Sequence, residues 1–187
     1  DIDYLIITPA FLSAQAERLA NINRLKNNLN VKVVTLESIY TEFSTGMQDL
    51  SAIRNLVKYV YDNASNSNNR LKYLCLFGDA SFDYKDRIQN NTNIAPSWLS
   101  KNSFSLTSSF ISDDFFGMMD ASEGSIVTAD KLDIAVGRIL AESIQRADEM
   151  VDKIESYYSF DTYANWRNNF LLISDCLLYT SPSPRDY

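Results

Sequence analysis

The feature that most constrains the fold is an uninterrupted apolar run, Tyr73–Phe77, which is followed directly by Gly78 and Asp79. A run without polar alternation is typical of a strand buried on both faces, as in a parallel sheet that helices cover. A similar run ends in Gly137 and Arg138. Because such sheets place their functional groups just past the carboxyl ends of the strands, we expect these glycines and charged residues to lie near the functional site.

The rest of the chain alternates between strand-like and helix-like patterns. Strands are expected at 3–8, 31–36, 71–77, 132–136 and 170–173, a short helical turn at 38–43, and helices at 11–27, 50–63 and 141–159. Asp49 precedes the helix at 50–63 and is expected to cap it. A strand–helix–strand order predicts right-handed crossovers, so we expect an α/β fold with a helix-flanked parallel sheet. Residues 79–130 show neither pattern, and a long irregular region in a compact domain is usually functional.

The composition excludes several classes of function. A chain of 187 residues has room for one domain and part of another. Its net charge of -7 argues against nucleic-acid binding, which depends on clustered Lys and Arg side chains. No apolar run is long enough to cross a bilayer, and the glycines are wrongly spaced for a phosphate-binding loop. Because the chain contains no histidine, it has no Ser–His or Cys–His catalytic pair and no His-ligated metal site.

The cysteines are too few for a disulfide scaffold. Cys75 lies within an expected strand, where we predict a small core residue and not a reactive thiol. Cys176 begins the segment CLLYTSPSPRD, which resembles the translation of a sequencing-library transposon adapter. We therefore expect residues 176–187 to be a non-native tail and Asp175 to be the last native residue. Since the chain begins with Asp1 and not with Met, we also expect it to be an internal piece of a longer protein.

Several acidic residues lie at or after the ends of the expected strands and could converge near Arg138. They are Asp79, Asp83, Asp113, Asp114 and Asp133. We favour a structural interpretation, in which Asp79 caps loop amides and a carboxylate pairs with Arg138 in a bidentate contact that holds the long loop. A calcium site is the second interpretation, because calcium binds hard oxygen ligands, although the spacing matches no known calcium loop. The third is a catalytic pair of carboxylates, which requires one raised and one ordinary pKa.

Several motifs, in order along the chain, resemble those of the gingipain-like cysteine peptidases. They are IYTEFSTG at 39–46, QD at 48–49, SAIR at 51–54, LCLFGDASFDY at 74–84, SDDFFG at 112–117 and DIAVGR at 133–138. The resemblance covers nearly all of residues 1–175. It implies a caspase-like α/β catalytic domain of two subdomains, in which residues 1–159 form the first subdomain and residues 160–175 begin the second. The chain is therefore expected to be truncated after the first subdomain.

The resemblance further implies a cysteine nucleophile whose thiolate attacks a carbonyl group, with a histidine as the base. Both residues are expected downstream of the matched motifs, so no catalytic residue is assigned here and this fragment alone is predicted to be inactive. The positions that carry over are scaffold positions at strand ends: Gly78, Asp79, Ser112, Asp113, Asp114, Gly137 and Arg138. The thiol chemistry itself requires no cofactor.

Within the family, the motifs are most similar to the sortase branch that belongs to the type IX secretion system of Bacteroidota. This similarity implies an exported enzyme at the cell surface and outer membrane that removes C-terminal signal domains from secreted cargo and joins the cargo to anionic lipopolysaccharide. The implied partners are this cargo and other type IX secretion components. Two alternatives stay open: another gingipain-like surface protease that degrades proteins, and a non-enzymatic acidic α/β binding module.

Overall fold

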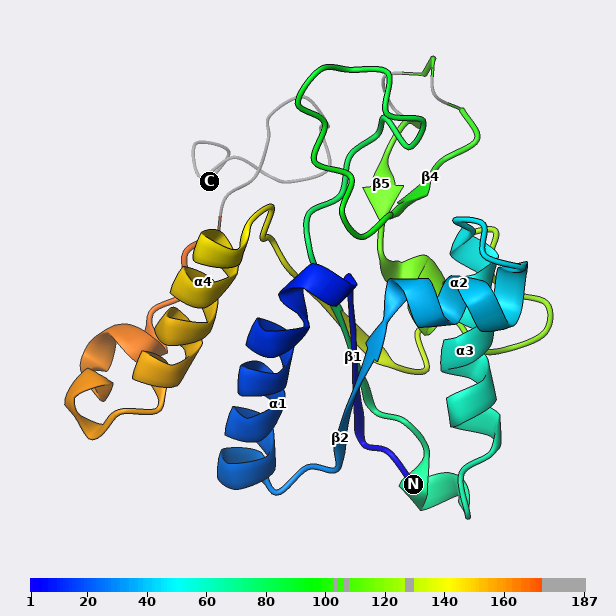
Figure 1. Cartoon of the computed structure of the whole chain (residues 1–187). Coiled ribbons are helices and arrows are strands. Elements are labelled where there is room, and N and C mark those ends of the chain that lie inside the picture. Colours follow the sequence, from blue (N-terminus) through cyan, green and yellow to red (C-terminus); the bar gives the residue numbers. More distant parts are fainter. Residues whose placement is uncertain (103, 106–107, 127–129, 173–187) are drawn as a thin grey trace, which may run out of the picture.

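The structure, a computed structural model, is built on a sheet of four parallel strands with helices on both faces (Figure 1). It describes residues 1–102, 104–105, 108–126 and 130–172. The strands are β1 (Tyr4–Thr8), β2 (Val31–Thr35), β3 (Tyr73–Phe77) and β6 (Ala135–Ile139), in the order β2-β1-β3-β6. Every neighbouring pair is parallel. The predicted α/β fold with a helix-flanked parallel sheet is confirmed.

One face of the sheet is covered by α1 (Ser13–Asn27) and α4 (Ile144–Tyr157). Alternate strand residues point toward these helices, among them Ile6, Cys75 and Phe77. They are buried together with Val31 of β2 and with residues of the two helices and their connections: Leu12, Ala16, Leu19, Ala20, Ala141, Ala147 and Val151. Cys75 is thus a core residue, as its place in the apolar run predicted.

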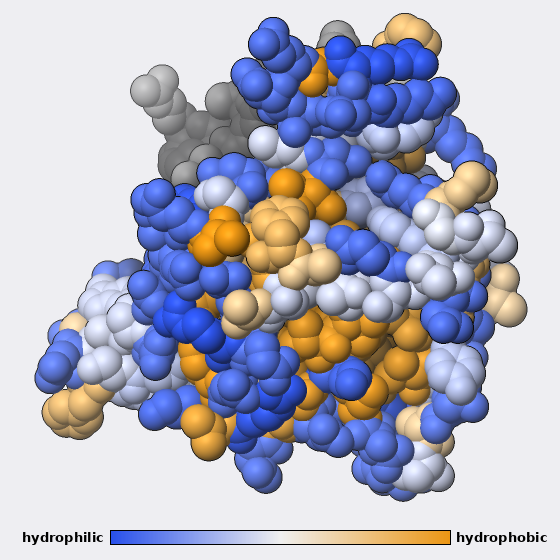
Figure 2. Space-filling model, viewed as in Figure 1, coloured by the Kyte–Doolittle hydropathy of each residue, from blue (hydrophilic) through white to orange (hydrophobic). Residues whose placement is uncertain are grey.

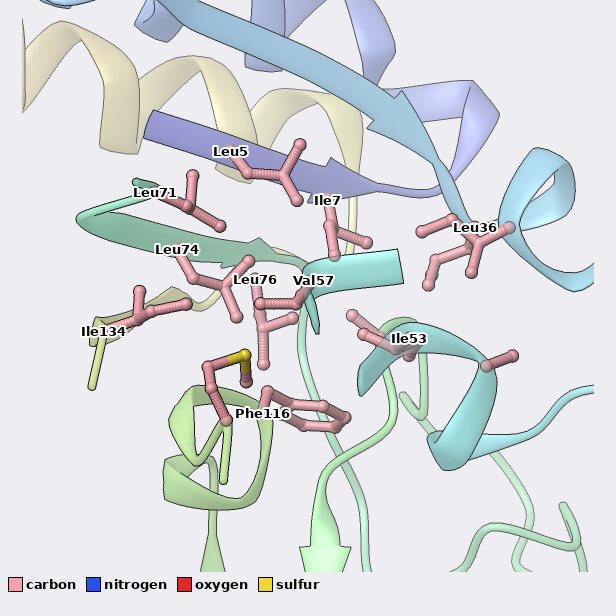
Figure 3. Packing of buried hydrophobic residues seen from close by; sticks show 14 residues of the cluster. Leu5, Ile7, Leu36, Ile53, Val57, Leu71, Leu74, Leu76, Phe116 and Ile134 are labelled. Carbon is pink, nitrogen blue, oxygen red and sulfur yellow. The ribbon is translucent and has the colours of Figure 1, made fainter. Parts of the chain in front are cut away.

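The opposite face is covered by α2 (Leu36–Ser44), α3 (Leu50–Asp62) and the short 3-10 helix η3 (Asp114–Gly117). Figure 3 shows the strand side chains of this face, among them Leu74 and Leu76, packed toward Phe116 of η3. Figure 2 shows an apolar area between β2 and α3, at the margin of this layer. Since apolar burial contributes about 25 cal/mol per Å², the two layers supply most of the favourable free energy of folding.

Side-chain caps set the starts of α2, α3 and α4. The Asp49 carboxylate accepts a hydrogen bond from the Ser51 N–H at 2.8 Å and caps α3, as predicted. The Thr35 and Ser143 hydroxyl groups accept the corresponding bonds at the starts of α2 and α4. Because of these caps, α2 is a complete helix and not a short turn, and α4 begins at Ile144 and not at residue 141.

β6 begins at Ala135, whereas the sequence pattern placed a strand at 132–136. The N–H groups of Asp133 and Ile134 both donate to the Gly117 carbonyl oxygen, at 3.0 and 3.3 Å, and so do not join the sheet. The ladder starts with the Ala135 N–H, which donates to the Lys72 carbonyl oxygen at 3.0 Å. The contact with Gly117, in the long connection between β3 and β6, therefore moves the start of β6 toward the carboxyl end of the chain.

The region after β3 contains short elements that the sequence pattern did not predict. β4 (Trp98–Leu99) and β5 (Ile111–Ser112) form an antiparallel pair ahead of η3. The strand expected at 170–173 is absent from the described part of that segment, since residues 170–172 are exposed and Ile173 lies outside the described residues. A strand needs a neighbour for its backbone N–H and C=O groups, and no described strand lies beside these residues. Of the helices in the described ranges, none is long and apolar enough to span a membrane.

Candidate functional site

The strands β3 and β6 end side by side, so the residues just past Phe77 and Ile139 share one edge of the sheet. The Gly78 N–H donates to the Ile139 carbonyl oxygen at 2.9 Å, and the Asp79 N–H donates to that of Ala141 at 3.2 Å. These bonds hold the start of the long β3–β6 connection against the end of β6. This is the carboxyl edge of the sheet, at which parallel α/β proteins bind their ligands.

Arg138 holds the connection through its guanidinium group. Nε and Nη2 donate to Asp113 Oδ2 and Oδ1, at 2.8 and 2.7 Å. Nη1 donates to the carbonyl oxygens of Gly78 and Ala95, at 2.8 and 2.6 Å, and Nη2 donates to that of Pro96 at 3.4 Å. Every N–H of the group thus has an acceptor. The Arg138 and Asp113 side chains are only 10% and 22% exposed, so this bidentate pair is partly shielded from water.

Ser97 extends the same network. Its hydroxyl group donates to Asp113 Oδ1 at 2.7 Å and lies 3.3 Å from the Ser112 carbonyl oxygen. Ser97 is 6% exposed, so the hydroxyl group needs these acceptors inside the protein. Three segments of the chain, near residues 78, 96 and 112, are thus held together at one point. The side chains of Arg138, Asp113 and Ser97 make the contacts between them.

The two glycines of the site have different roles. Gly78 has φ of +145°, and a Cβ atom there would lie 3.0 Å from Ile94 Cγ2 and 3.3 Å from Ala95 Cβ. A side chain at this position is therefore opposed by the backbone conformation and by the packing. Gly137 lies in β6 with an ordinary strand backbone, and a Cβ atom there would meet no heavy atom within 4 Å.

Asp79 contributes through its backbone, which corrects the prediction that its carboxylate caps loop amides. Its carbonyl oxygen accepts hydrogen bonds from the N–H groups of Ile94 and Ala95, at 3.0 and 2.8 Å. Burial raises the pKa of the Asp79 carboxyl group, and the nearby Glu142 carboxylate raises it further, while Arg138 acts in the opposite direction. Asp79 lies at the predicted strand end, but its carboxylate is not the partner of Arg138.

Asp83 performs the capping that was expected of Asp79. Its Oδ2 accepts hydrogen bonds from the N–H groups of Arg87 and Ile88, at 2.5 and 2.7 Å. The Asp83 N–H donates to the Ser81 hydroxyl oxygen at 3.1 Å, and its carbonyl oxygen accepts from the Asn91 side chain at 2.7 Å. Asp83 is 8% exposed, so these bonds replace the water that the carboxylate has lost.

The remaining predicted residues do not converge into one cluster. The Ser112 hydroxyl oxygen accepts from the Asp114 N–H at 3.1 Å, and Asp133 Oδ2 accepts from the Met119 N–H at 2.9 Å. Among the residues that the structure describes, no three His, Cys, Asp or Glu side chains lie close enough to hold a metal ion together. The calcium interpretation and the catalytic-pair interpretation stay predictions.

A second arginine, which the sequence interpretation did not assign to the site, holds the other half of the connection. Arg54 of α3 donates from Nε and Nη2 to the Met118 carbonyl oxygen, at 3.0 and 2.7 Å, and from Nη2 to that of Glu123 at 3.1 Å. Gly124 has φ of +104°, and a Cβ atom there would lie 3.1 Å from the guanidinium carbon. The sequence did contain a signal for this role: Arg54 is the charged residue of the SAIR motif, and it lies on a helix with a strong apolar stripe.

Cys75 lies at the centre of the sheet, between β1 and β6, and is 4% exposed. Burial raises the pKa of its thiol to about 11, so the thiolate that nucleophilic catalysis requires is disfavoured at neutral pH. A groove of about 700 Å³ lies over this part of the sheet, between α1 and α4, and Tyr4, Cys75, Gly137 and Tyr158 are among its lining residues. The groove is on the opposite face of β6 from the Arg138 guanidinium group, because strand side chains alternate.

The model of peptidase family C25 matches residues 1–183. Among solved structures, the crystal structure of dimeric latent PorU from Porphyromonas gingivalis is similar, with a TM-score of 0.72 and 29% sequence identity. The match covers 91% of this chain and 17% of that chain, so the chain spans about a sixth of the PorU length. No curated protein matches the chain. The family match includes part of the segment 176–187, whose origin stays a prediction.

Proposed function

Because the chain belongs to peptidase family C25, the gingipain family, we propose that it is the first subdomain of a cysteine endopeptidase that acts as a sortase. The observation that carries this proposal is the family match over nearly the whole chain, together with the fold shared with PorU. In this proposal, residues 1–159 supply the scaffold of the catalytic domain, and residues 160–175 begin the second subdomain. The enzyme is exported and works at the cell surface.

The nucleophile and the base come from the remainder of the enzyme. The chain has no histidine, and Cys75 is a buried residue within β3 whose thiol has a raised pKa. The contribution of this chain is to position the loops at the carboxyl edge of the sheet, and Arg138 with Asp113 is the central contact. Such positioning matters because small displacements of a catalytic group lower the rate substantially.

The reaction begins when the cysteine thiolate attacks the carbonyl carbon at the junction between cargo and signal domain. The peptide C–N bond breaks, the signal domain leaves with a proton on its new amino group, and the cargo stays on the enzyme as a thioester. A nucleophile on anionic lipopolysaccharide then attacks the thioester and releases the thiol. The cargo carboxyl end is thereby joined to the surface polysaccharide.

Two experiments test this function. The purified 187-residue chain is expected to cleave no protein or peptide substrate, with or without a reducing thiol, because it lacks the nucleophile and the base. Thiol-dependent cleavage that disappears in a Cys75→Ser variant would contradict this.

The second experiment replaces the matching segment of Porphyromonas gingivalis PorU with residues 1–172 of this chain. We expect the chimera to remove signal domains and to attach cargo to lipopolysaccharide, visible as a shift in cargo mass. A matched chimera with the PorU nucleophile changed to alanine is expected to do neither. A folded surface chimera that degrades proteins without attaching cargo would support the degradative protease, and one without any activity would support the binding module.

A further inference from the structure

The short helix η3 is held at both ends by arginine side chains that come from different elements. Asp113, at the start of η3, forms the bidentate pair with Arg138 of β6. Met118, just past its end, accepts two bonds from Arg54 of α3 at its carbonyl oxygen, from Nε at 3.0 Å and from Nη2 at 2.7 Å. The helix therefore links a guanidinium group at the carboxyl edge of the sheet to a guanidinium group on α3.

The packing of η3 leaves it little freedom to shift between these two ends. Phe116 is fully buried on the sheet face that α3 covers (Figure 3). Gly117 lies so close to β6 that a Cβ atom there would be 2.6 Å from Val136 Cγ2. The Phe116 N–H also donates to the Asp113 carbonyl oxygen at 3.1 Å. Because close-packed interiors transmit strain, a displacement at Met118 is expected to reach Asp113.

A stack of aromatic rings forms a second link between the same two groups. The Arg54 guanidinium carbon lies 5.4 Å from the centroid of the Phe115 ring. The Phe115 ring stacks on that of Trp98, with centroids 6.4 Å apart and planes 21° from parallel. Trp98 directly follows Ser97, whose hydroxyl group donates to Asp113 Oδ1. Arg54 thus reaches the Asp113 carboxylate by two routes, one through the backbone of η3 and one through β4.

The contacts of Arg54 show that this side chain holds backbone and does not neutralise a carboxylate. The ion pairs among the residues that the structure describes do not include it. Besides its two bonds to Met118, Nη2 lies 3.4 and 3.1 Å from the carbonyl oxygens of Asp120 and Glu123. A rigid guanidinium fork that binds several carbonyl oxygens fixes the position of the backbone that carries them.

We propose that Arg54 is a positioning residue for the carboxyl edge of the sheet: through η3 and the Phe115–Trp98 stack, it sets where Asp113 meets Arg138. The inference rests on the proposed function, which gives the loops at this edge their role in the complete enzyme. Arg54 makes none of the described hydrogen bonds or ring contacts with residues 78–96. Its effect there is therefore carried by a contiguous chain of packed and hydrogen-bonded groups.

The test uses the 187-residue chain with Trp166→Phe, in which Trp98 is the remaining tryptophan. Arg54→Met is expected to change the near-UV circular dichroism of Trp98, because the ring stack loses its cation. Hydrogen exchange measured by NMR is expected to become at least about fivefold faster at the N–H groups of residues 78, 94 and 95, which Arg54 does not touch. Arg54→Lys keeps the charge but not the fork, so it is expected to produce a smaller rise.

Two further variants separate this role from a general loss of stability. Arg70→Met is the matched control, since Arg70 also lies over a ring, 4.7 Å from the Tyr61 centroid, but binds no part of the connection. It is expected to leave the Trp98 signal and the exchange at residues 78, 94 and 95 unchanged. In an Asp113→Asn background, Arg54→Met is expected to have a smaller effect on that exchange, because the pair through which it acts is already weakened.

Two results would overturn the proposal. One is a rise in exchange confined to residues 118–124, which would mean that Arg54 holds only its own segment of the connection. The other is an equal effect of Arg54→Met with and without the Asp113 carboxylate. If Arg54→Met does not fold by far-UV circular dichroism, Phe115→Leu takes its place, with the same expected and overturning results. These readouts involve no peptidase activity, so their failure leaves the proposed function standing, and an inactive PorU chimera leaves this inference standing.

Discussion

Arg138 and Asp113 lie 25 residues apart in the chain and form a bidentate pair, with Nε–Oδ2 and Nη2–Oδ1 distances of 2.8 and 2.7 Å. The same guanidinium group donates to the carbonyl oxygens of Gly78, Ala95 and Pro96. One strand residue therefore sets the positions of several loop segments at the edge of the sheet.

Replacing Arg138 with Gln is expected to lower the free energy of unfolding by about 3–5 kcal/mol, because it leaves the partly buried Asp113 carboxylate without its cation. Urea denaturation followed by circular dichroism measures the change. Arg146→Gln is the matched control, since its pair with Glu149 is about half exposed and water screens such surface pairs, so this change is expected to leave the stability nearly unaltered. In the double variant with Asp113→Asn, the loss is expected to be smaller than the sum of the single losses. Additive losses would show that the pair has no coupling.

Gly78→Ala is expected to cost about 1–3 kcal/mol, because φ of +145° is strained for any side chain and the new Cβ atom meets Ile94. Gly137→Ala is the control, with an ordinary strand backbone and open space, and is expected to change the stability by less than about 0.5 kcal/mol. Thermal melts of the two variants provide the comparison. Equal melting temperatures would mean that the loop after β3 relaxes freely.

Asp83→Ala is expected to lower the stability by about 1–3 kcal/mol, because it removes the acceptor of the Arg87 and Ile88 N–H groups in a buried turn. Asp114→Ala serves as the control, since this residue is exposed and its carboxylate makes none of the described hydrogen bonds. Hydrogen exchange is expected to rise at residues 87 and 88 in the first variant alone. Unchanged exchange there would remove the capping role from Asp83.

The Cys75 thiol makes the stability depend on alkaline pH. Its pKa is about 11 in the folded chain, against an ordinary value of 9.0, because burial disfavours the thiolate. Between these values the unfolded chain releases a proton that the folded chain keeps, so this contribution is full below pH 9 and is lost as the pH rises toward 11. In a Cys176→Ser background, the thiol is expected to resist alkylation at pH 8 until denaturant is added.

The matched variant for this pH dependence is Cys75→Ala in the same background, which is expected to lose stability less steeply from pH 9 upward. Denaturation midpoints at a series of pH values measure the difference between the two chains. A native Cys75 thiol that reacts as fast as a free thiol at pH 8 would contradict the buried, protonated state.

The sequence by itself determined the elements and most of their order. Uninterrupted apolar runs such as Tyr73–Phe77 have no polar face to turn toward water, so they predict parallel strands buried on both faces, and Leu74–Phe77 are buried. The cap at Asp49 and the core position of Cys75 are equally local, because each depends on a few adjacent residues. The motifs also identified the gingipain family, which the family match confirms.

Only the tertiary structure decided how the long connection is held. Five carboxylates were candidates for Arg138, and the return path of the chain brings Asp113 to it while Asp79 contributes backbone groups. The start of β6 is set by Gly117, and Arg54 binds the other half of the connection from α3. These choices depend on residues distant in the chain that meet only once the sheet and helices have packed. No local pattern carries that information, because hydrogen-bond partners are selected by position in space.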